Sequence, residues 1–348
     1  VVTLISNAGV SNGLKIQSMN WVLTENQTIN GDLELLNSTL DLAGKTLTVT
    51  GNLIQSGGIL SVNSGSLIVE GDYLIETPAV DADSSPTTSS GVLYMLNDAD
   101  KVLVNGNFVM DSYHAHNSYL TAGELEVQGD FTQHSTHSTS SASHNFNTSG
   151  THRVKLSGSS LQSVSFDDPS SSHSHFNVLE MTNSSVDGIT LLSRVNVIKE
   201  LIATTTPLVH SELLSLSGSA FISQGNWAYD LILDGHSGNW TLLQDQVIDN
   251  NFYLNALTLD LNGKTLTIKG NLIQSGGALS VNNGNLIVKG DYLIQTPAVD
   301  ADSQPTHSAG RLQMSNDTDK VLVKGHFVMD SYNSHNGYLT AGELEVQG

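Results

Sequence analysis

A long internal repeat constrains this chain more than any other feature of its sequence. When the sequence is shifted by 219 positions, Asp41–Gly129 aligns with Asp260–Gly348 without a gap, and 69 of the 89 aligned residues are identical. A chain with such a repeat folds as a series of similar units, each of which packs on its neighbours. We therefore expect a first super-repeat at residues 1–219 and a partial second super-repeat at residues 220–348, within a longer repetitive protein.

A shorter phrase recurs inside the long repeat. It reads LTVTGNL at Leu47–Leu53, LIVEGDY at Leu67–Tyr73, VLVNGNF at Val102–Phe108 and LEVQGDF at Leu125–Phe131, and its glycines are 20, 35 and 23 residues apart. Apolar and polar residues alternate before each glycine, which is typical of a strand with one buried face. Gly followed by Asn or Asp indicates a tight turn at the end of each strand.

These patterns predict an all-β fold, a single-stranded right-handed parallel β-helix (a β-solenoid) with irregular coils of about 20–29 residues and loop insertions. An antiparallel sandwich also has short strands, but it does not so easily place one phrase at matching positions of successive units. The handedness follows from the general preference of parallel connections. The two copies agree with buried alternation, because Leu93 and Met95 are retained as Leu312 and Met314 while their neighbours change.

Composition excludes several classes of partner. The net charge is −21 with only 13 Lys and Arg residues, so we expect neither nucleic acid nor an anionic membrane surface as a partner. The chain has no Cys, which excludes disulfides and thiolate metal sites. No apolar run approaches the ~20 residues of a membrane helix, so we expect no membrane insertion.

Two stretches carry a resemblance to known proteins. They are GTHRVKLSGSSLQSVSFDDPSSSHSHFNVLEMTN at Gly150–Asn183 and LDLNGKTLTIKGNLIQSGGALSVNNGNLIVKGDYLIQT at Leu259–Thr296. They resemble a repeat unit of large secreted bacterial proteins, in which a strand is followed by G-[ST]-x-x-Q-x-V-x-F, a Ser-rich turn and F-x-x-L-x-[IM]-x-N. The resemblance implies an extracellular or cell-surface fibre or adhesin on a right-handed β-solenoid, and it names no ligand.

We therefore expect a structural extracellular protein, a segment of a self-assembling or repeat-extended fibre on a microbial surface, with other copies of itself as end-to-end or lateral partners. The alternative is an adhesin or glycan-binding stalk that uses the loops Thr77–Gly91 and Asp111–Gly123. Aromatic and imidazole rings in these loops and their second copies are candidates for stacking on sugar rings. These candidate ligand-binding residues are Tyr113, His116, Tyr119, Tyr332, His335 and Tyr338.

We expect no enzyme and no obligatory cofactor. The paired carboxylates Glu124 and Glu126 alternate with Leu125 and Val127, as the outward residues of an ordinary strand do, and no G-x-S-x-G motif is present. Eight of the 13 histidines lie between His114 and His175. They are either solvated turn residues or ligands for Zn²⁺, Cu²⁺ or Ni²⁺.

Aspartates in the loops persist between the copies and have two readings. D-x-D pairs offer hard oxygen ligands to Ca²⁺, whereas Asp also caps turns by accepting from the backbone. The candidate calcium ligands are Asp81, Asp83, Asp98, Asp100, Asp300, Asp302, Asp317 and Asp319.

One strand of the first copy has apolar residues where the second copy has polar ones. Val92, Tyr94 and Leu96 correspond to Arg311, Gln313 and Ser315. We expect the three apolar residues to face outward, either as the product of surface drift or as a lateral contact patch.

Overall fold

The computed structural model describes residues 10–11, 13–79, 81, 84–203, 208–209, 214–216, 221–224, 226–227, 230–233, 239–298 and 304–348. It is all-β, with parallel sheets and one short 3₁₀ helix among the described residues. The chain forms two compact units, Val1–Asn196 and Val197–Gly348, here called unit 1 and unit 2. The super-repeat has a different boundary, at residue 219, because it is a period of the sequence whereas the compact units reflect contacts.

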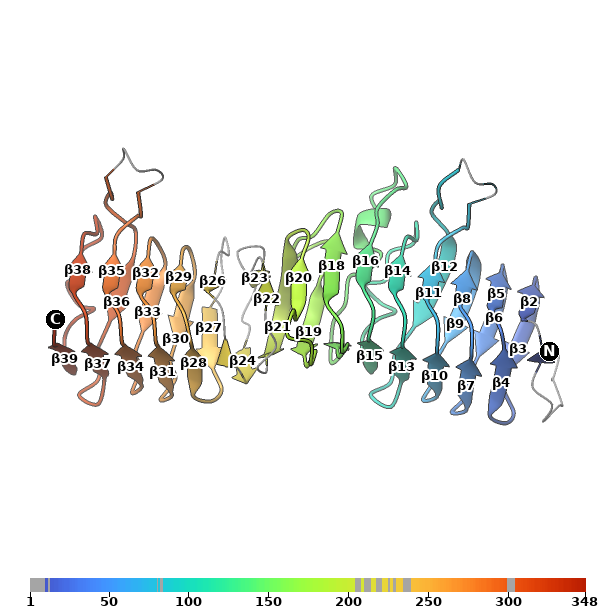
Figure 1. Cartoon of the computed structure of the whole chain (residues 1–348), viewed down its shortest axis with the longest axis horizontal. Helices are drawn as coiled ribbons and strands as arrows, with labels where there is room; N and C mark the ends of the chain where they lie inside the picture. The colour runs from blue at the N-terminus through green and yellow to red at the C-terminus, as the bar shows by residue number, and fades with distance from the viewer. Residues whose placement is uncertain are drawn as a thin grey trace. The chain divides into compact units, whose positions relative to one another are not determined.

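Unit 1 contains three parallel sheets (Figure 1). The first is β1 (Val10–Ser11), β4 (Gln27–Asn30), β7 (Thr46–Val49), β10 (Ser66–Val69), β13 (Lys101–Val104), β15 (Glu124–Val127), β17 (Arg153–Leu156) and β19 (Phe176–Met181). The second is β2 (Leu14–Gln17), β5 (Leu33–Leu36), β8 (Leu53–Gln55), β11 (Tyr73–Ile75), β14 (Phe108–Met110), β16 (Phe131–Gln133), β18 (Gln162–Phe166) and β20 (Ile189–Leu191). The third is β3 (Asn20–Val22), β6 (Ser38–Asp41), β9 (Gly57–Ser61) and β12 (Ser90–Tyr94).

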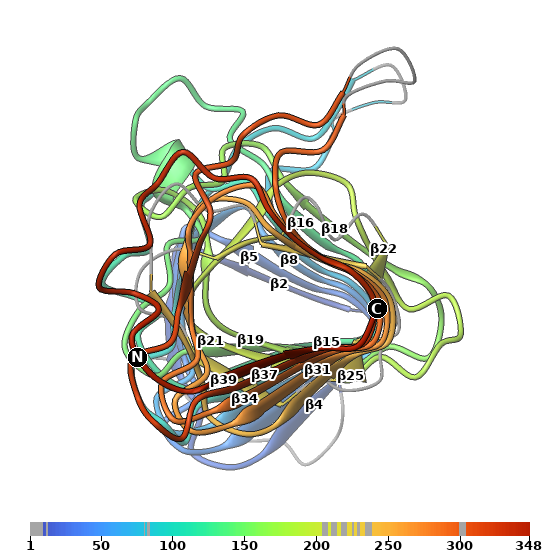
Figure 2. The ribbon, with the colours of Figure 1, turned by 90° about the vertical axis from the view of Figure 1, so that its left-hand side faces the viewer.

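Successive strands of unit 1 visit the sheets in turn, so each strand pairs with its counterpart in the next coil. Leu47 of β7 faces Leu67 of β10, which faces Val102 of β13 and then Leu125 of β15. Seen along the stack, β2, β5 and β8 lie on one side of the interior and β4 and β15 on the other (Figure 2). This arrangement agrees with a β-solenoid type of fold.

The interior of unit 1 is filled by the alternate apolar residues that the sequence pattern identifies. Leu47, Val49, Leu93 and Met95 are all fully buried, as predicted. Rings of neighbouring coils also meet, and the centroids of Phe108 and Phe131 are 5.4 Å apart. Each coil therefore contributes its own layer to a continuous apolar core, in which stacked identical or similar side chains bury one another.

Unit 2 repeats the same plan. Its first sheet is β21 (Val195–Ala203), β23 (Leu214–Leu216), β24 (Phe221–Gln224), β27 (Asn239–Leu242), β30 (Thr258–Asp260), β33 (Ala278–Ser280) and β36 (Arg311–Gln313). The second is β25 (Asn226–Trp227), β28 (Gln246–Ile248), β31 (Thr265–Ile268), β34 (Asn285–Val288), β37 (Lys320–Val323) and β39 (Glu343–Val346). The third is β26 (Leu231–Leu233), β29 (Phe252–Leu254), β32 (Leu272–Gln274), β35 (Tyr292–Ile294) and β38 (Phe327–Met329). The short strand β22 (Leu208–Val209) also belongs to this unit.

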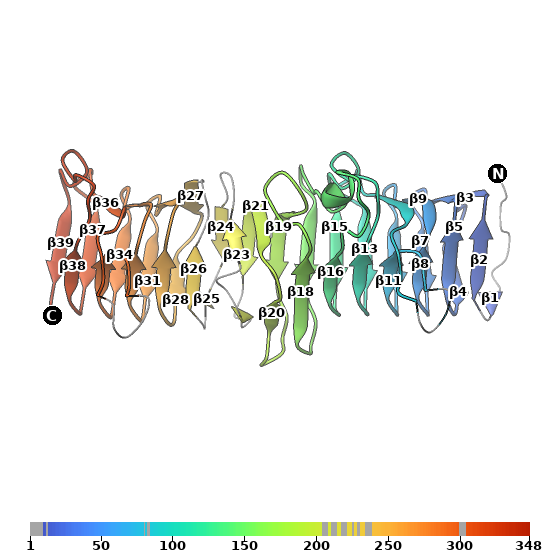
Figure 3. The same cartoon turned by 90° about the horizontal axis from the view of Figure 1, so that it is seen from above.

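Two kinds of segment in unit 1 leave the sheets. Residues 76–79 and 84–89, between β11 and β12, lie outside the sheets, and an antiparallel bridge joins Thr77 to Thr87 (Figure 1). The 3₁₀ helix η1 (Ala142–His144) lies outside the stacked strands near β16 (Figure 3). Loops therefore enter between strands without disturbing the strand register.

Candidate functional site: the ladder between coils and the loop residues

A ladder of Asp and Asn side chains links successive coils of unit 1. The side-chain Oδ1 of each residue accepts a hydrogen bond from the backbone N–H of the equivalent residue in the next coil, at 2.7–2.8 Å. We call this the Asx ladder. Its rungs are Asp32, Asn52, Asp72, Asn107 and Asp130.

Unit 2 has its own Asx ladder with the same geometry. Its rungs are Asp230, Asn251, Asn271 and Asp291, and the last of them accepts from the backbone N–H of His326 at 2.8 Å. His326 stands where unit 1 has Asn107. The ladder thus explains the Asn or Asp of the repeated phrase, for which sequence reasoning gave only a role in the turn.

The glycines that precede Asn52 and Asp72 are required by close stacking between coils. A Cβ atom on Gly71 would lie 2.4 Å from Asn52 Oδ1 and 2.8 Å from Gly51 O. Neither Gly51 nor Gly71 has a positive φ, so an L side chain would fit the backbone angles but not the space. Close stacking is therefore a reason for glycine at these two corners that sequence reasoning did not give.

His116 holds a loop to the preceding coil. Its side chain is fully buried, Nδ1 lies 3.0 Å from the carbonyl oxygen of His114, and Nε2 accepts from the backbone N–H of Leu93 at 3.2 Å. Because a carbonyl only accepts, Nδ1 carries the hydrogen. Burial lowers the pKa of His116 to about 4, so the ring is neutral at physiological pH.

The burial of His116 contradicts the prediction that it contacts a ligand. Its counterpart in unit 2, His335, is half-buried and makes the same contacts, 3.1 Å from the carbonyl oxygen of Asn333 and 3.4 Å from Leu312 N. The retained histidine therefore serves as a backbone anchor.

Two of the predicted sugar-stacking tyrosines make packing contacts. Tyr119 stacks on Tyr94 with ring centroids 4.6 Å apart. In unit 2, where Gln313 replaces Tyr94, the equivalent Tyr338 accepts a hydrogen bond from Nη1 of Arg311 at 2.7 Å, and the guanidinium lies 5.0 Å from its ring centroid. The tyrosine at this position is thus contacted in both units, by Tyr94 in unit 1 and by Arg311 in unit 2.

The other two predicted tyrosines differ in exposure. Tyr332 has 71% of its surface exposed. Tyr113 is half-buried between imidazoles, with its ring centroid 4.4 Å from that of His114 and 5.5 Å from that of His137.

The proposed outer strip of the first copy is only partly exposed. Leu96 is 48% exposed and Tyr94 is half-buried beneath its stack with Tyr119. Val92 is buried, with 7% exposure, so the prediction of a continuous exposed strip of three apolar residues is wrong at this position. Strand alternation identifies the outward side of β12, but it does not reveal a loop that covers the strand.

Asp100 and its counterpart Asp319 are fully buried backbone acceptors. Oδ1 of Asp100 accepts from Ser64 N at 2.5 Å, and Oδ2 accepts from Leu96 N and Asn97 N at 2.7 and 3.0 Å. Asp319 repeats this arrangement in unit 2. Both carboxylates therefore cap turns, which is the alternative to calcium binding.

The remaining candidate calcium ligands lie apart from these caps. Asp81, Asp98 and Asp317 are exposed, and Asp98 accepts a hydrogen bond from the Thr151 hydroxyl. Asp83, Asp300 and Asp302 lie outside the described residues. Within the described ranges, no group of three or more His, Asp or Glu side chains is arranged to hold a metal ion.

Two further buried histidines were not singled out by sequence reasoning. Neither ring nitrogen of His152 has a hydrogen-bond partner, and burial lowers its pKa to about 3. Both nitrogens of His175 lie 2.8 Å from carbonyl oxygens, those of His173 and Thr148. Burial lowers the pKa of His175, and the carbonyl contacts act against that shift. The recurring pattern of a second His two residues after the first, at His116 and His175, was the available signal.

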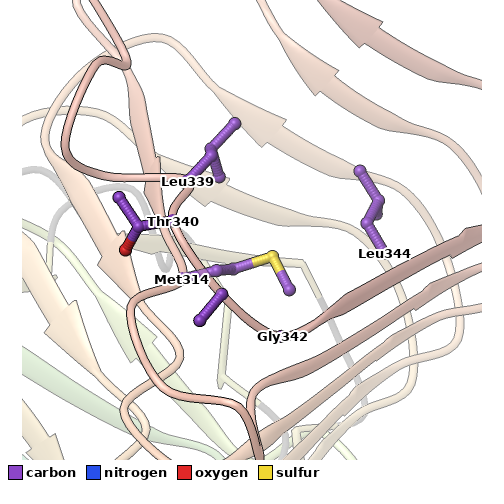
Figure 4. Close-up of a pocket in the computed structure, with 6 residues that line it drawn as sticks. Met314, Leu339, Thr340, Gly342 and Leu344 are labelled. Atoms are coloured by element: carbon purple, nitrogen blue, oxygen red, sulfur yellow. The ribbon is translucent and has the colours of Figure 1, made fainter.

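An open pocket of about 320 Å³ occurs in unit 2 beside β39 (Figure 4). Its lining includes Met314, Leu339 and Leu344. The equivalent residues of unit 1 are fully buried, and the carbonyl oxygens of Leu120, Thr121 and Gly123 there accept from the N–H groups of Ser149, Thr151 and Arg153. In unit 1 a further coil thus fills the equivalent space.

Comparisons provide no relative for this arrangement. In the described part of the chain no helix has the length and apolar character needed to cross a membrane. No protein-family model, no curated protein and no solved structure matches the sequence or the fold.

Proposed function

We propose that this chain is a structural protein, a segment of an extracellular β-solenoid fibre on a microbial surface that is extended by repetition of its coils. In this proposal the coils form one continuous right-handed parallel β-helix, with the handedness that parallel connections prefer. The observation that carries the proposal is the Asx ladder, because each rung presents an acceptor to the backbone of the coil that follows.

Three contacts make each coil a template for the next. Parallel strands pair in register, as Tyr73 does with Leu53 and Phe108. The glycine corners stack directly, with Gly71 N donating to Gly51 O at 3.1 Å. The Asx ladder adds one side-chain bond per coil. Stability then depends mainly on neighbours, so length can grow with the number of coils.

Side chains also join neighbouring coils on the outside of unit 1. Glu126 of β15 is paired with Lys155 of β17 at 3.2 Å, and Leu125 beside it is fully buried. In this proposal other copies of the chain, which carry the same coils, are the expected partners.

A glycan-binding stalk is the second candidate, and one observation favours it. Tyr113 is half-exposed beside the imidazoles of His114 and His137, which suits stacking on a sugar ring. Tyr119, His116 and Tyr338 carry little weight for this function because they are used in packing.

Assembly of the purified chain tests the structural proposal. We expect concentration-dependent assemblies in sedimentation and electron microscopy, with a fibre-diffraction spacing of about 4.8 Å along the axis. A chain that stays monomeric at all concentrations would refute self-assembly. Glycan-array binding lost in Tyr113→Ala would then support the stalk.

A further inference from the structure

Two imidazole rings from different segments of unit 1 meet at its surface. His144 ends η1, and His173 lies in the Ser-rich turn that precedes β19. Their ring centroids are 4.7 Å apart with an interplanar angle of 64°. The side chain of His173 is 35% exposed, so ions in solution can reach the pair.

The backbone around the pair is fixed by hydrogen bonds. The Ser174 hydroxyl donates to the carbonyl oxygen of Ser143 at 2.9 Å and accepts from Phe146 N at 3.1 Å. The Asn147 amide donates to the carbonyl oxygen of Ser172 at 3.0 Å. These bonds join the two segments on both sides of the rings, so the imidazoles are held together without a ligand.

In both rings Nδ1 lies beside an oxygen acceptor. Nδ1 of His144 lies 2.7 Å from the carbonyl oxygen of Ser140, which requires a hydrogen on that nitrogen. Nδ1 of His173 lies 2.9 Å from Oδ2 of Asp168, in the geometry of an ion pair rather than a straight hydrogen bond. A carboxylate at this position favours hydrogen on Nδ1 as well. In the neutral rings, Nε2 is then the nitrogen with a free lone pair.

The ring separation agrees with two ligands of one metal ion. An ion about 2.1 Å from Nε2 lies roughly 3.2 Å from the ring centre, so two imidazoles at about 90° around the ion have centres about 4.5 Å apart. A carboxylate on the second nitrogen of a histidine ligand, as Asp168 is on His173, is the usual outer partner of such sites. The chain has no thiolate to compete for the ion, and its net charge of −21 attracts cations.

We propose that His144 and His173 are the protein ligands of a solvent-open site for a borderline divalent metal ion, with Cu²⁺ bound more tightly than Zn²⁺. Water supplies the remaining ligands, which is consistent with the absence of a third protein ligand among the described residues. The preference for Cu²⁺ follows the general order of affinities at nitrogen ligands. The site is independent of the proposed structural function, since neither ring takes part in strand pairing or in the Asx ladder.

Titration of the whole chain with Cu²⁺ at pH 7.4 tests the site. We expect calorimetry to detect one site per chain, and electron paramagnetic resonance to detect hyperfine coupling to two imidazole nitrogens. His144→Asn and His173→Asn should each weaken binding at least tenfold, and Asp168→Asn about tenfold. His134→Asn is the matched control, because His134 also faces a carboxylate, Asp167 at 3.2 Å, and should leave binding unchanged.

The variants also separate metal binding from a simple ring contact. Circular dichroism melts without metal identify any variant that fails to fold. If a variant does not fold, its binding data are set aside, and the electron paramagnetic resonance spectrum of the unaltered chain with Cu²⁺ tests the proposal. A spectrum with a single nitrogen ligand would overturn the proposal. The proposal would also be overturned if the double variant His144→Asn, His173→Asn bound Cu²⁺ as tightly as the unaltered chain does.

Discussion

Asp100 allows the role of a buried carboxylate to be measured directly. It has 0% exposure and accepts three backbone hydrogen bonds, from Ser64, Leu96 and Asn97. Asp100→Ala leaves three N–H groups without their acceptor, at about 1–3 kcal/mol for each group that stays buried. Some relaxation is expected, so we predict a loss of about 3–6 kcal/mol in the free energy of unfolding. Asp98→Ala removes one exposed contact and should cost less than about 1 kcal/mol.

Native-state hydrogen exchange is the suitable assay because two compact units need not unfold together. In Asp100→Ala the amides of Ser64, Leu96 and Asn97 should lose protection, while amides of unit 2 keep theirs. Equal stability of Asp100→Ala and Asp98→Ala would refute the capping argument. A melting temperature that rises with millimolar Ca²⁺ in the unaltered chain, but not in Asp100→Ala, would instead favour the calcium reading.

Three other predictions follow from the packing of single residues. Gly71→Ala should lower the free energy of unfolding in urea by more than about 2 kcal/mol, because its Cβ would overlap Asn52 Oδ1 and Gly51 O. Gly44→Ala has open space around the Cβ and only a positive φ to oppose it, so it should cost about 1 kcal/mol. Equal costs would contradict the stacking explanation. Tyr94→Gln should lower the free energy of unfolding by about 0.5–1.5 kcal/mol, because it removes stacking on Tyr119. Adding Val92→Arg should restore part of this stability, since an Arg contacts the equivalent ring in unit 2. A double-mutant cycle without coupling would argue against the exchange of partners. The pKa of His152 is lowered from 6.5 to about 3, so its contribution to the free energy of unfolding is complete above pH 6.5 and is lost as the pH falls toward 3, by about 2 kcal/mol at pH 5. This acid sensitivity should be smaller in His152→Leu. An unchanged pH profile of unfolding in that variant would disprove it.

The strand plan is predictable from the sequence because it depends on alternation, which the repeat records twice. Leu93 and Met95 illustrate this, since their retention between the copies identifies the buried side of β12. The pairing register of successive strands can also be predicted from the sequence, because aligning the repeated phrases aligns the strands that they contain.

What the sequence does not reveal is contact between residues that are distant along the chain. The Asx ladder joins residues 20–35 positions apart, and nothing local distinguishes such an Asn from one in an isolated turn. His116 looks like a solvated loop residue until the structure buries it against Leu93. Val92 is outward by alternation and yet buried, because burial also depends on what covers the strand.

The order of residues along the Asx ladder has an electrostatic consequence. In unit 1 the rungs alternate as Asp32, Asn52, Asp72, Asn107 and Asp130, and in neither unit do two aspartates occupy adjacent described rungs. Two like charges about 4.8 Å apart repel by roughly 0.9 kcal/mol even in water, whereas doubling the distance halves this energy and brings it within reach of salt screening. Duplication of an even number of coils keeps the alternation in unit 1, but insertion of a single Asp-bearing coil would create a repulsive joint. Growth of the repeat is thereby favoured where it leaves no two aspartates on adjacent rungs.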